Sequence, residues 1–188
     1  MKVKKLFPGI SLIEKKFNKN QIYYFLKTPS VAITIAKIKN KFLVVSQKRI
    51  PINKITFEFP GGLIDKGSNP KKSAENELLE ETGYKNISKL KKIFSIYPEP
   101  GRLNCKYHCF FTDRVIRINK PEKGINLHLL SRSQILQLIK KDKFDHACHA
   151  YAFFSYLNMK KRHMHDMRDQ IYLFLSIEEF EILIKDVN

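Results

Sequence analysis

The sequence predicts an α+β fold, in which a mixed or antiparallel β-sheet is covered by helices. Three observations predict it. Strand patterns dominate the first sixty residues, a single helix pattern interrupts them near the middle, and helix patterns dominate the last third. A chain of 188 residues with 43% hydrophobic residues is long enough for one domain with its own core, or for one domain and a small appendage.

The first strand patterns are rich in β-branched and aromatic residues and are separated by short turns. They cover residues 20–28, 31–39, 42–46 and a short stretch over 57–62 that ends in Pro-Gly-Gly. Close spacing of this kind favours antiparallel pairing. Pro70 and Gly83 then bracket a helix over 70–82, because proline suits the first turn of a helix and glycine suits its end.

Strand patterns return over 93–97 and 105–116. From Ser131 the pattern is helical, first through Ile139 and then over 144–157. A last segment, 176–185, begins with a serine followed three residues later by a glutamate, which is the spacing of a capping box. Strands at the start and helices at the end complete the α+β pattern.

Charge and cysteine content restrict the class of protein. Lys and Arg number 35 against 18 Asp and Glu, and a net charge of +17 attracts nucleotides, nucleic acids or anionic surfaces. The excess is spread along the whole chain, which a general composition bias explains equally well. Three cysteines disfavour a disulfide framework and indicate a reducing, cytoplasmic environment. No apolar run approaches the ~20 residues of a membrane-spanning helix, so no membrane association is expected.

The strongest chemical pattern is a cluster of three carboxylates on the helix over 70–82. Glu77, Glu80 and Glu81 lie three and four positions apart, so they share one face. Like charges on one turn repel, and a divalent cation reverses that cost because carboxylates are hard ligands suited to Mg²⁺ or Mn²⁺. A solvated acidic face has the same spacing, so the cluster alone leaves both interpretations open.

The surroundings of this cluster resemble the signature of the Nudix hydrolases. That signature is Gly, five residues, Glu, seven residues, then Arg-Glu-aliphatic-any-Glu-Glu-any-Gly-aliphatic. The residues in register are Gly62, Glu77, Leu78, Glu80, Glu81 and Gly83. Ser68 replaces the first glutamate, Asn76 replaces the arginine, and Tyr84 replaces the last aliphatic residue. The resemblance implies the Nudix fold, a mixed sheet sandwiched between helices (α/β/α).

The same resemblance implies a metal site. Glu77, Glu80 and Glu81, with the backbone at Gly61, would hold Mg²⁺ or Mn²⁺, and the three glutamates would be catalytic. The family's missing Glu and Arg orient the metal-binding carboxylates. Losing one of them would leave an uncompensated charge, whereas losing both is a neutral exchange. We therefore expect a rearranged but active site, with a weakly active or inactive nucleotide-binding module as the alternative.

Residues outside the signature resemble the ADP-ribose pyrophosphatase branch of the family. The matching segments are Gln47–Arg49, Glu58–Gly62 and Pro98–Gly101. By this resemblance Arg49, Glu58 and Arg102 bind the substrate, and Glu122 is a further catalytic glutamate. The implied reaction is hydrolysis of a nucleoside diphosphate sugar, most simply ADP-ribose to AMP and ribose 5-phosphate.

The resemblance also implies an organisation of the chain. Residues 1–28 form an N-terminal antiparallel strand region that joins two subunits into a homodimer, 29–157 the Nudix domain, and 158–188 a basic, helical extension. The charge leaves another substrate class open, an RNA 5′ end or a dinucleoside polyphosphate.

The remaining patterns are weaker. The chain has no tryptophan, so the aromatic residues that could stack on a base are Phe7, Tyr23, Tyr24 and Phe25, and each is equally suited to core packing. Strand spacing places Cys105 and Cys109 opposite His108, which favours buried thiols over a zinc site. His146 and His149 share one helix face, in a structural or substrate-proximal role.

Overall fold

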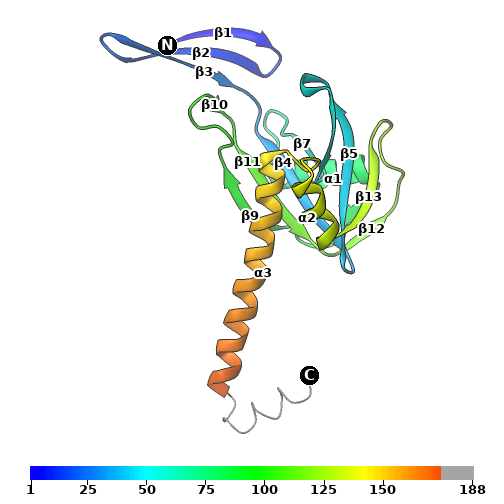
Figure 1. Ribbon diagram of the computed structural model, residues 1–188. Helices are drawn as coiled ribbons and strands as arrows, with labels where there is room; N and C mark the ends of the chain where they lie inside the picture. The colour runs from blue at the N-terminus through cyan, green and yellow to red at the C-terminus, as the bar shows by residue number, and fades with distance from the viewer. Residues whose placement is uncertain (175–188) are drawn as a thin grey trace. The chain divides into compact units, whose positions relative to one another are not determined.

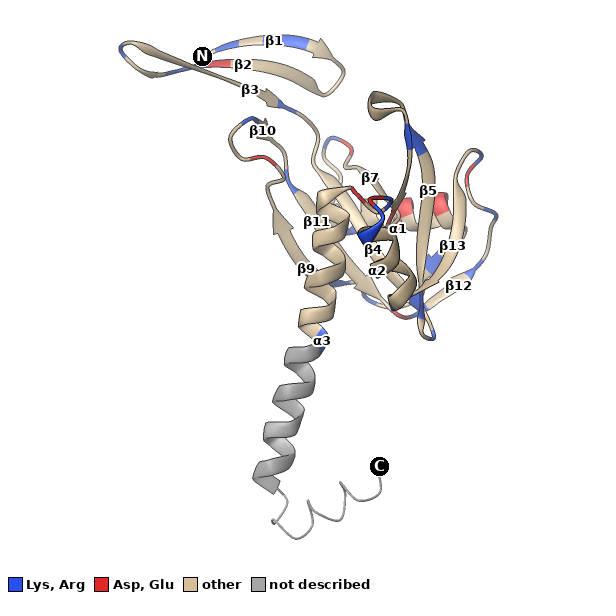
Figure 2. Cartoon of the chain, viewed as in Figure 1, with Lys and Arg blue, Asp and Glu red and all other residues tan. Residues whose placement is uncertain are grey.

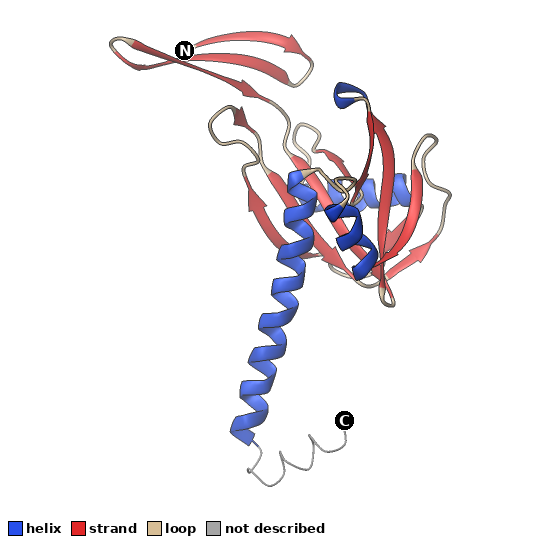
Figure 3. Ribbon diagram, in the orientation of Figure 1, coloured by secondary structure: helices blue, strands red, loops and turns tan. Residues whose placement is uncertain are grey.

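The structure, a computed structural model, describes the backbone of residues 1–174 and the side chains of residues 1–160. The chain divides into two units, Met1–Ala152 and Phe153–Asn188. The strands are β1 (Lys2–Phe7), β2 (Ile10–Asn18), β3 (Gln21–Lys27), β4 (Val31–Ile38), β5 (Lys41–Arg49), β6 (Lys54–Glu58), β7 (Gly61–Leu63), β8 (Tyr84–Asn86), β9 (Lys91–Ile96), β10 (Leu103–Asn104), β11 (Tyr107–Thr112), β12 (Val115–Arg117) and β13 (Asn126–Ser131). The helices are the short 3₁₀ helix η1 (Ile50–Ile52), α1 (Pro70–Thr82), α2 (Arg132–Lys140) and α3 (Ala147–Phe174) (Figures 1 and 3).

The central sheet is mixed, as predicted. Its strand order is β13-β5-β4-β11-β9, with β6 paired to β5 and β7 paired to β4. The β4–β11 pair is parallel, and all other strand pairs of this sheet are antiparallel. Strand β4 is central and is buried from Ala32 to Ala36. Both of its faces are covered, and its sequence is therefore almost entirely apolar.

Helices cover both faces of this sheet (Figure 1). On one face Leu43 of β5 packs with Leu78 of α1. On the other face the ring of Phe59 lies 6.3 Å from that of Phe42 and 5.3 Å from that of Phe144, between centroids. Because successive residues of a strand point to opposite faces, Phe42 and Leu43 fill two separate halves of the core. The α/β/α sandwich expected from the resemblance is confirmed.

The N-terminal strands form a separate sheet with the order β1-β2-β3-β10. Only the short β10 comes from the rest of the chain, and it pairs parallel to β3. Most side chains of β1, β2 and β3 are exposed, and Ile13 is the buried exception. The sequence predicted β3, and it missed β1 and β2 as separate strands because lysines interrupt their apolar pattern.

Other element boundaries also differ from the predictions. The predicted strand over 105–116 is two strands, β11 and β12. The predicted strand over 57–62 is two strands, β6 and β7, because Pro60 lacks the N–H that a continuous ladder requires. Strand β13, which was not predicted, ends at Ser131, and Ser131 is also the N-cap of α2 with a complete capping box. Helix α3 begins at Ala147 and continues through Leu157, and no proline or glycine stands there to stop it. The predicted helix over 176–185 lies outside the described residues.

Helix α1 ends where a loop docks onto it. The Gly83 amide donates to the Leu79 carbonyl (2.8 Å), and the Gly83 carbonyl accepts from the amides of Ile118 (2.9 Å) and Asn119 (3.0 Å). Gly83 has φ of 73°, and a Cβ there would overlap the Asn119 backbone. This glycine is therefore needed twice, for the left-handed cap and for the close approach of the loop. In residues 1–174, no helix is long and apolar enough to cross a membrane.

We predict that Gly83→Ala destabilises the protein more than Gly67→Ala. Both glycines have positive φ, 73° and 82°, so both substitutions strain the backbone by about 1 kcal/mol. A Cβ at Gly67 meets nothing within 4 Å, whereas at Gly83 it overlaps backbone. Urea unfolding should show a loss of about 1 kcal/mol for Gly67→Ala and of more than about 2 kcal/mol for Gly83→Ala. Equal losses would contradict the tight docking of this loop.

Candidate active site

Two glutamates of α1, Glu77 and Glu81, face the turn between β6 and β7. Asn69 caps the helix by accepting from the Lys71 amide (2.9 Å), which fixes the start of α1 and so the phase of its faces. Glu81 is buried, Glu77 is partly buried and Glu80 is exposed. Figure 2 shows acidic segments of α1 in red. The structure thus brings together the carboxylates that the sequence predicted.

Two glycines let the backbone approach these carboxylates. The Gly61 amide donates to Glu81 Oε2 (2.8 Å). A Cβ on Gly62 would overlap the Glu77 carboxylate, and a Cβ on Gly61 would overlap Ala32 and Ile33 of the neighbouring β4. Any larger residue at Gly62 would therefore displace Glu77. Neither glycine has a positive φ in this structure. Glycine is needed at both positions because a Cβ would overlap neighbouring atoms.

The local charge balance favours a cation. Burial, together with the nearby charges of Glu80, Glu122 and Asp65, raises the pKa of Glu77 to about 7. Burial also raises the pKa of Glu81 to about 7, although the Gly61 hydrogen bond opposes this. Carboxylates that are crowded and partly desolvated are costly when ionised, and a divalent ion offsets that cost. The donor set of hard oxygens fits Mg²⁺ or Mn²⁺.

The loop that docks on Gly83 also delivers Glu122 to the same cluster. The Glu122 amide donates to the Glu80 carbonyl (2.9 Å). The Glu122 carboxylate is close enough to contribute to the raised pKa of Glu77. Its side chain is exposed, so it can exchange protons with solvent. The sequence placed Glu122 near the site by resemblance alone, and the structure supplies the hydrogen bond that holds it there.

A second cluster, built on an ion pair between Arg49 and Glu58, lies beside the first. Arg49 of β5 donates through Nε (2.8 Å) and a terminal nitrogen to the two oxygens of Glu58, and Thr56 also donates to Glu58. Burial opposes ionisation of Glu58, but these hydrogen bonds and the neighbouring charge of Arg49 lower its pKa to about 2. The hydrogen bond from Arg49 to Glu58 raises the pKa of Arg49, which stays cationic.

This second cluster lines a cavity of about 580 Å³. Gly61 and Gly62 line the same cavity, so it reaches the backbone that contacts the carboxylates of α1. Two of the five N–H groups of Arg49 are used by Glu58, which leaves others for an anion in the cavity. Other lining side chains include Thr56, Tyr107, His146 and His149.

One group in the described residues has the spacing of a metal site. One ligand atom each from Glu58, His146 and His149 lies within 4.8 Å of the others. However, His149 Nδ1 accepts from the Phe59 amide (3.0 Å), so the proton of the neutral ring is on Nε2, the atom that faces Glu58 at 3.8 Å. Burial lowers the pKa of His149 to about 3. His149 is therefore a neutral donor toward Glu58, and neither of its nitrogens is free to bind a metal.

His149 was predicted only as structural or substrate-proximal, and its bond to Phe59 gives it a definite structural role. Thr56 was missed, because a threonine two residues from a glutamate on a strand is too common to indicate a contact. Tyr107 was missed because nothing in its own strand indicates a contact with the site. The ring of Tyr107 lies 5.7 Å from that of His146. The contacts of these residues depend on the arrangement of β11, β6 and α3, which local sequence patterns do not describe.

Three further residues lie away from the two clusters. Arg102 is exposed, lies on the loop before β10, and does not line the cavity that contains Arg49. The Ser68 hydroxyl bonds that of Ser73 (3.1 Å). Asn76 is exposed and lines a different hollow with Lys72 and Glu75. The neutral exchange at Ser68 and Asn76 thus leaves no unpaired charge at either position.

Comparisons with known proteins agree with this geometry. The NUDIX domain family matches residues 26–153. The chain is 28% identical over 158 residues to the ADP-ribose pyrophosphatase of Bacillus subtilis (strain 168), covering 81% of this chain and 83% of that protein. It is 37% identical over 83 residues to the ADP-sugar pyrophosphatase of Mus musculus, covering 44% of this chain and 35% of that protein. The crystal structure of an ADP compounds hydrolase has a TM-score of 0.71 at 14% identity, over 82% of this chain and 86% of that one, which shows a shared fold.

The family match spans more than half of the sequence and includes the whole carboxylate helix, so the chain belongs to the Nudix family. Within that family it is a Nudix pyrophosphohydrolase similar to the ADP-ribose pyrophosphatases. Nudix hydrolases use divalent metal ions, in agreement with the donor set described above.

We predict that the Glu58 cluster makes stability depend on pH. The pKa of Glu58 is lowered in the folded state, from its ordinary 4.5 to about 2. Its contribution is therefore complete above about pH 4.5 and is lost as the pH falls toward 2. Glu58→Gln should lower the free energy of unfolding by about 2 kcal/mol at pH 7 and by much less near pH 2.5. Urea unfolding at both pH values checks this, and an equal loss at both would contradict the ionic role of Glu58.

Proposed function

We propose that this protein hydrolyses the diphosphate of a nucleoside diphosphate sugar, with ADP-ribose giving AMP and ribose 5-phosphate. The observation that supports the proposal is that the carboxylate cluster of α1 and the cavity lined by the Arg49–Glu58 ion pair meet at Gly61 and Gly62. A cation-seeking carboxylate cluster lies on one side of this turn, and a cavity lined by Arg49 lies on the other. A diphosphate is the ligand that needs both a divalent ion and a fixed positive side chain.

The metal is proposed to be Mg²⁺ or Mn²⁺, held by Glu77, Glu80 and Glu81 with the backbone at Gly61. When bound there, such an ion neutralises phosphate charge and lowers the pKa of a coordinated water. The protein's part is to keep Glu77 against Gly62, and to keep Glu81 on the Gly61 amide, so that the carboxylates are in place before the substrate arrives.

Other side chains would bind the diphosphate and accept the proton of the attacking water. Arg49 is held by Glu58 in one orientation, so it can donate to a diphosphate oxygen without losing freedom on binding. Glu122, or one of the glutamates of α1, would accept the proton of the attacking water. Glu122 is suited to this because it is exposed, stands beside Glu77, and is fixed only through its backbone.

The nucleoside diphosphate sugar is favoured over a triphosphate by the relatives. Proteins named ADP-ribose pyrophosphatase and ADP-sugar pyrophosphatase match this chain. Arg102 remains a proposed substrate contact that would require a ligand extending to the loop before β10.

A homodimer in the cytoplasm is part of the same proposal. The face of the N-terminal sheet that carries Ile22 and Tyr24 is exposed, and these residues are 46% and 45% accessible. An isolated sheet of this size needs an apolar face covered for stability. A second copy of residues 1–28 would supply that cover, and light scattering of the full chain tests it.

We predict that Glu81→Gln abolishes most of the activity. The amide keeps the shape of the side chain and can still accept from the Gly61 amide, but it loses the charge that holds a cation. With ADP-ribose and Mg²⁺ or Mn²⁺, release of AMP should fall by about 100-fold or more. EDTA should have the same effect on the wild type. Glu75→Gln, on α1 outside the cluster, is the matched control. A Glu81→Gln protein as active as the wild type would contradict the metal-helix proposal.

We predict that the double change Ser68→Glu and Asn76→Arg increases activity. It restores both charged residues that orient the metal-binding carboxylates elsewhere in the family, and such supports are worth about 10–100-fold in affinity or activity. Each single change adds one unpaired charge and should give less. The apparent affinity for Mn²⁺ and the rate of AMP release are the measurements. No gain in the double variant would show that the Ser68–Ser73 arrangement already supports the site.

A further inference from the structure

The peptide that joins Glu58 to Phe59 lies where the two halves of the site meet. Glu58 is the last residue of β6 and holds Arg49 through two hydrogen bonds. Two residues after Phe59, Gly61 begins β7 and donates to the Glu81 carboxylate (2.8 Å). A contact that fixes this peptide therefore also fixes Glu58 relative to Glu81.

The Phe59 amide has no partner in a strand ladder. It lies between the last residue of β6 and the first residue of β7, and the next residue, Pro60, has no N–H with which to continue the ladder. Phe59 is 1% exposed, so water does not reach its backbone. A buried amide without an acceptor is unfavourable, and the acceptor has to come from another element.

His149 of α3 supplies this acceptor. Its Nδ1 accepts from the Phe59 amide at 3.0 Å, across 90 positions of the chain. The ring is 3% exposed and packs on that of His146, with 4.4 Å between ring centroids, so it is held in one orientation. Its Nε2 lies 3.8 Å from Glu58, which is beyond the length of a hydrogen bond. The bond to Phe59 is therefore the stronger of the two contacts.

The next residues of the turn are bound to other elements. The Pro60 carbonyl accepts from the Thr34 amide of β4 (2.9 Å). The Thr34 hydroxyl donates in turn to the Ala74 carbonyl of α1 (3.1 Å). Residues 59, 60 and 61 thus bind α3, β4 and α1 in that order. Of these three contacts, the one from His149 lies nearest to Glu58 in the chain.

We propose that His149 is a positioning residue that sets the separation between the carboxylates of α1 and the Arg49–Glu58 pair. The proposal rests on the function proposed above, because a diphosphate that bridges a metal ion and Arg49 requires a fixed distance between them. His149 acts through the backbone and not on the substrate, since both of its nitrogens face protein atoms. Without the Nδ1 acceptor, the Phe59 amide would turn toward another partner, and Gly61 would move with it.

Asparagine and glutamine at position 149 separate the two ring nitrogens. The amide of an asparagine reaches the place of Nδ1, whereas that of a glutamine reaches the place of Nε2. His149→Asn therefore keeps an acceptor for Phe59, and His149→Gln loses it. Calorimetric Mn²⁺ affinity of the substrate-free protein, and kcat/KM for ADP-ribose, should stay close to wild type in His149→Asn. Both should fall by about 10- to 100-fold in His149→Gln.

The same two variants distinguish positioning from packing. Glutamine fills more of the volume of the ring than asparagine does, so packing alone ranks His149→Gln above His149→Asn. Positioning predicts the reverse order for Mn²⁺ affinity and for kcat/KM. Urea unfolding measures the packing effect separately. His149→Asn should be no more stable than His149→Gln and should still bind Mn²⁺ more tightly.

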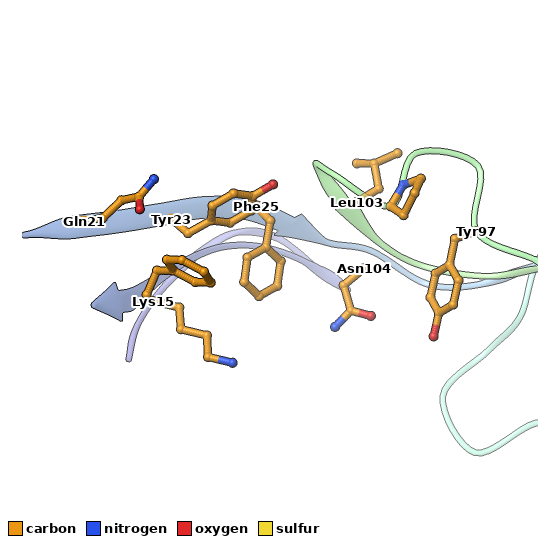
Figure 4. Close-up of a pocket in the computed structure, with 9 residues that line it drawn as sticks. Lys15, Gln21, Tyr23, Phe25, Tyr97, Leu103 and Asn104 are labelled. Carbon is orange, nitrogen blue, oxygen red and sulfur yellow. The ribbon is translucent and has the colours of Figure 1, made fainter. Parts of the chain in front are cut away.

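Two control variants leave the Phe59 bond intact. Cys148→Ala removes a buried side chain next to His149 on α3. Tyr97→Ala changes a separate cavity of about 610 Å³ on the N-terminal sheet, which shares no lining residue with the cavity that contains Arg49 (Figure 4). Both variants should keep the Mn²⁺ affinity of the wild type. A loss in Cys148→Ala as large as that in His149→Gln would overturn the proposal, because it would assign the effect to packing of α3.

The wild-type protein provides a test without substitution. An N–H···N hydrogen bond transmits a scalar coupling between its two nitrogens, so NMR of isotope-labelled protein should show coupling between the Phe59 amide and His149 Nδ1. Absence of the coupling would overturn the proposal, as would equal Mn²⁺ affinities in His149→Asn and His149→Gln. Neither measurement depends on turnover. If both results hold while the wild type does not hydrolyse ADP-ribose, the hydrolytic function fails and the positioning role of His149 stands.

Discussion

The close contact between the turn at Gly61–Gly62 and helix α1 is the constraint on which the site depends. The turn carries no side chain at either position. The Glu77 carboxylate occupies the space that a Cβ at Gly62 would fill, and the Glu81 carboxylate accepts from the Gly61 amide. The partly buried carboxylates are brought into a region where their own charges disfavour one another. The fold thus holds an arrangement that is costly without a cation, and a divalent ion removes the cost.

The Arg49–Glu58 pair is the counterpart of this cluster. Thr56 donates to Glu58, and the neutral ring of His149 lies beside Glu58. The same ring accepts from the Phe59 amide at the start of the turn. A buried carboxylate with three polar neighbours is locked in place, and it locks the arginine in turn. The turn between β6 and β7 therefore separates a site for cations from a site for anions, each positioned by residues that do not take part in the chemistry.

The sequence predicted the parts of this arrangement that are local. The spacing of Glu77, Glu80 and Glu81 fixes their helix face, and Pro70 and Gly83 fix the ends of α1. Glycines at 61 and 62 were recognised from resemblance, and the structure adds the contacts that require them. The division of β6 from β7 was not predicted, although Pro60 gives the physical reason for it.

Long-range contacts were beyond the sequence patterns. His149 lies ninety positions from Phe59, and nothing in its own segment indicates the bond between them. The N-terminal sheet was only partly expected, because β1 and β2 bury almost nothing and so lack the apolar alternation by which strands are recognised. Arg102 was assigned by resemblance, and the structure places it on a loop that is tied to β3.

The central claim is that α1 and the glycine turn form a preorganised divalent-metal site. Calorimetric titration of the substrate-free protein with Mn²⁺ tests it most directly. The account predicts saturable binding in the wild type, retained in Glu75→Gln and lost in Glu77→Gln and Glu81→Gln. Equal heats of binding in the wild type and in the Glu77→Gln and Glu81→Gln variants would contradict it.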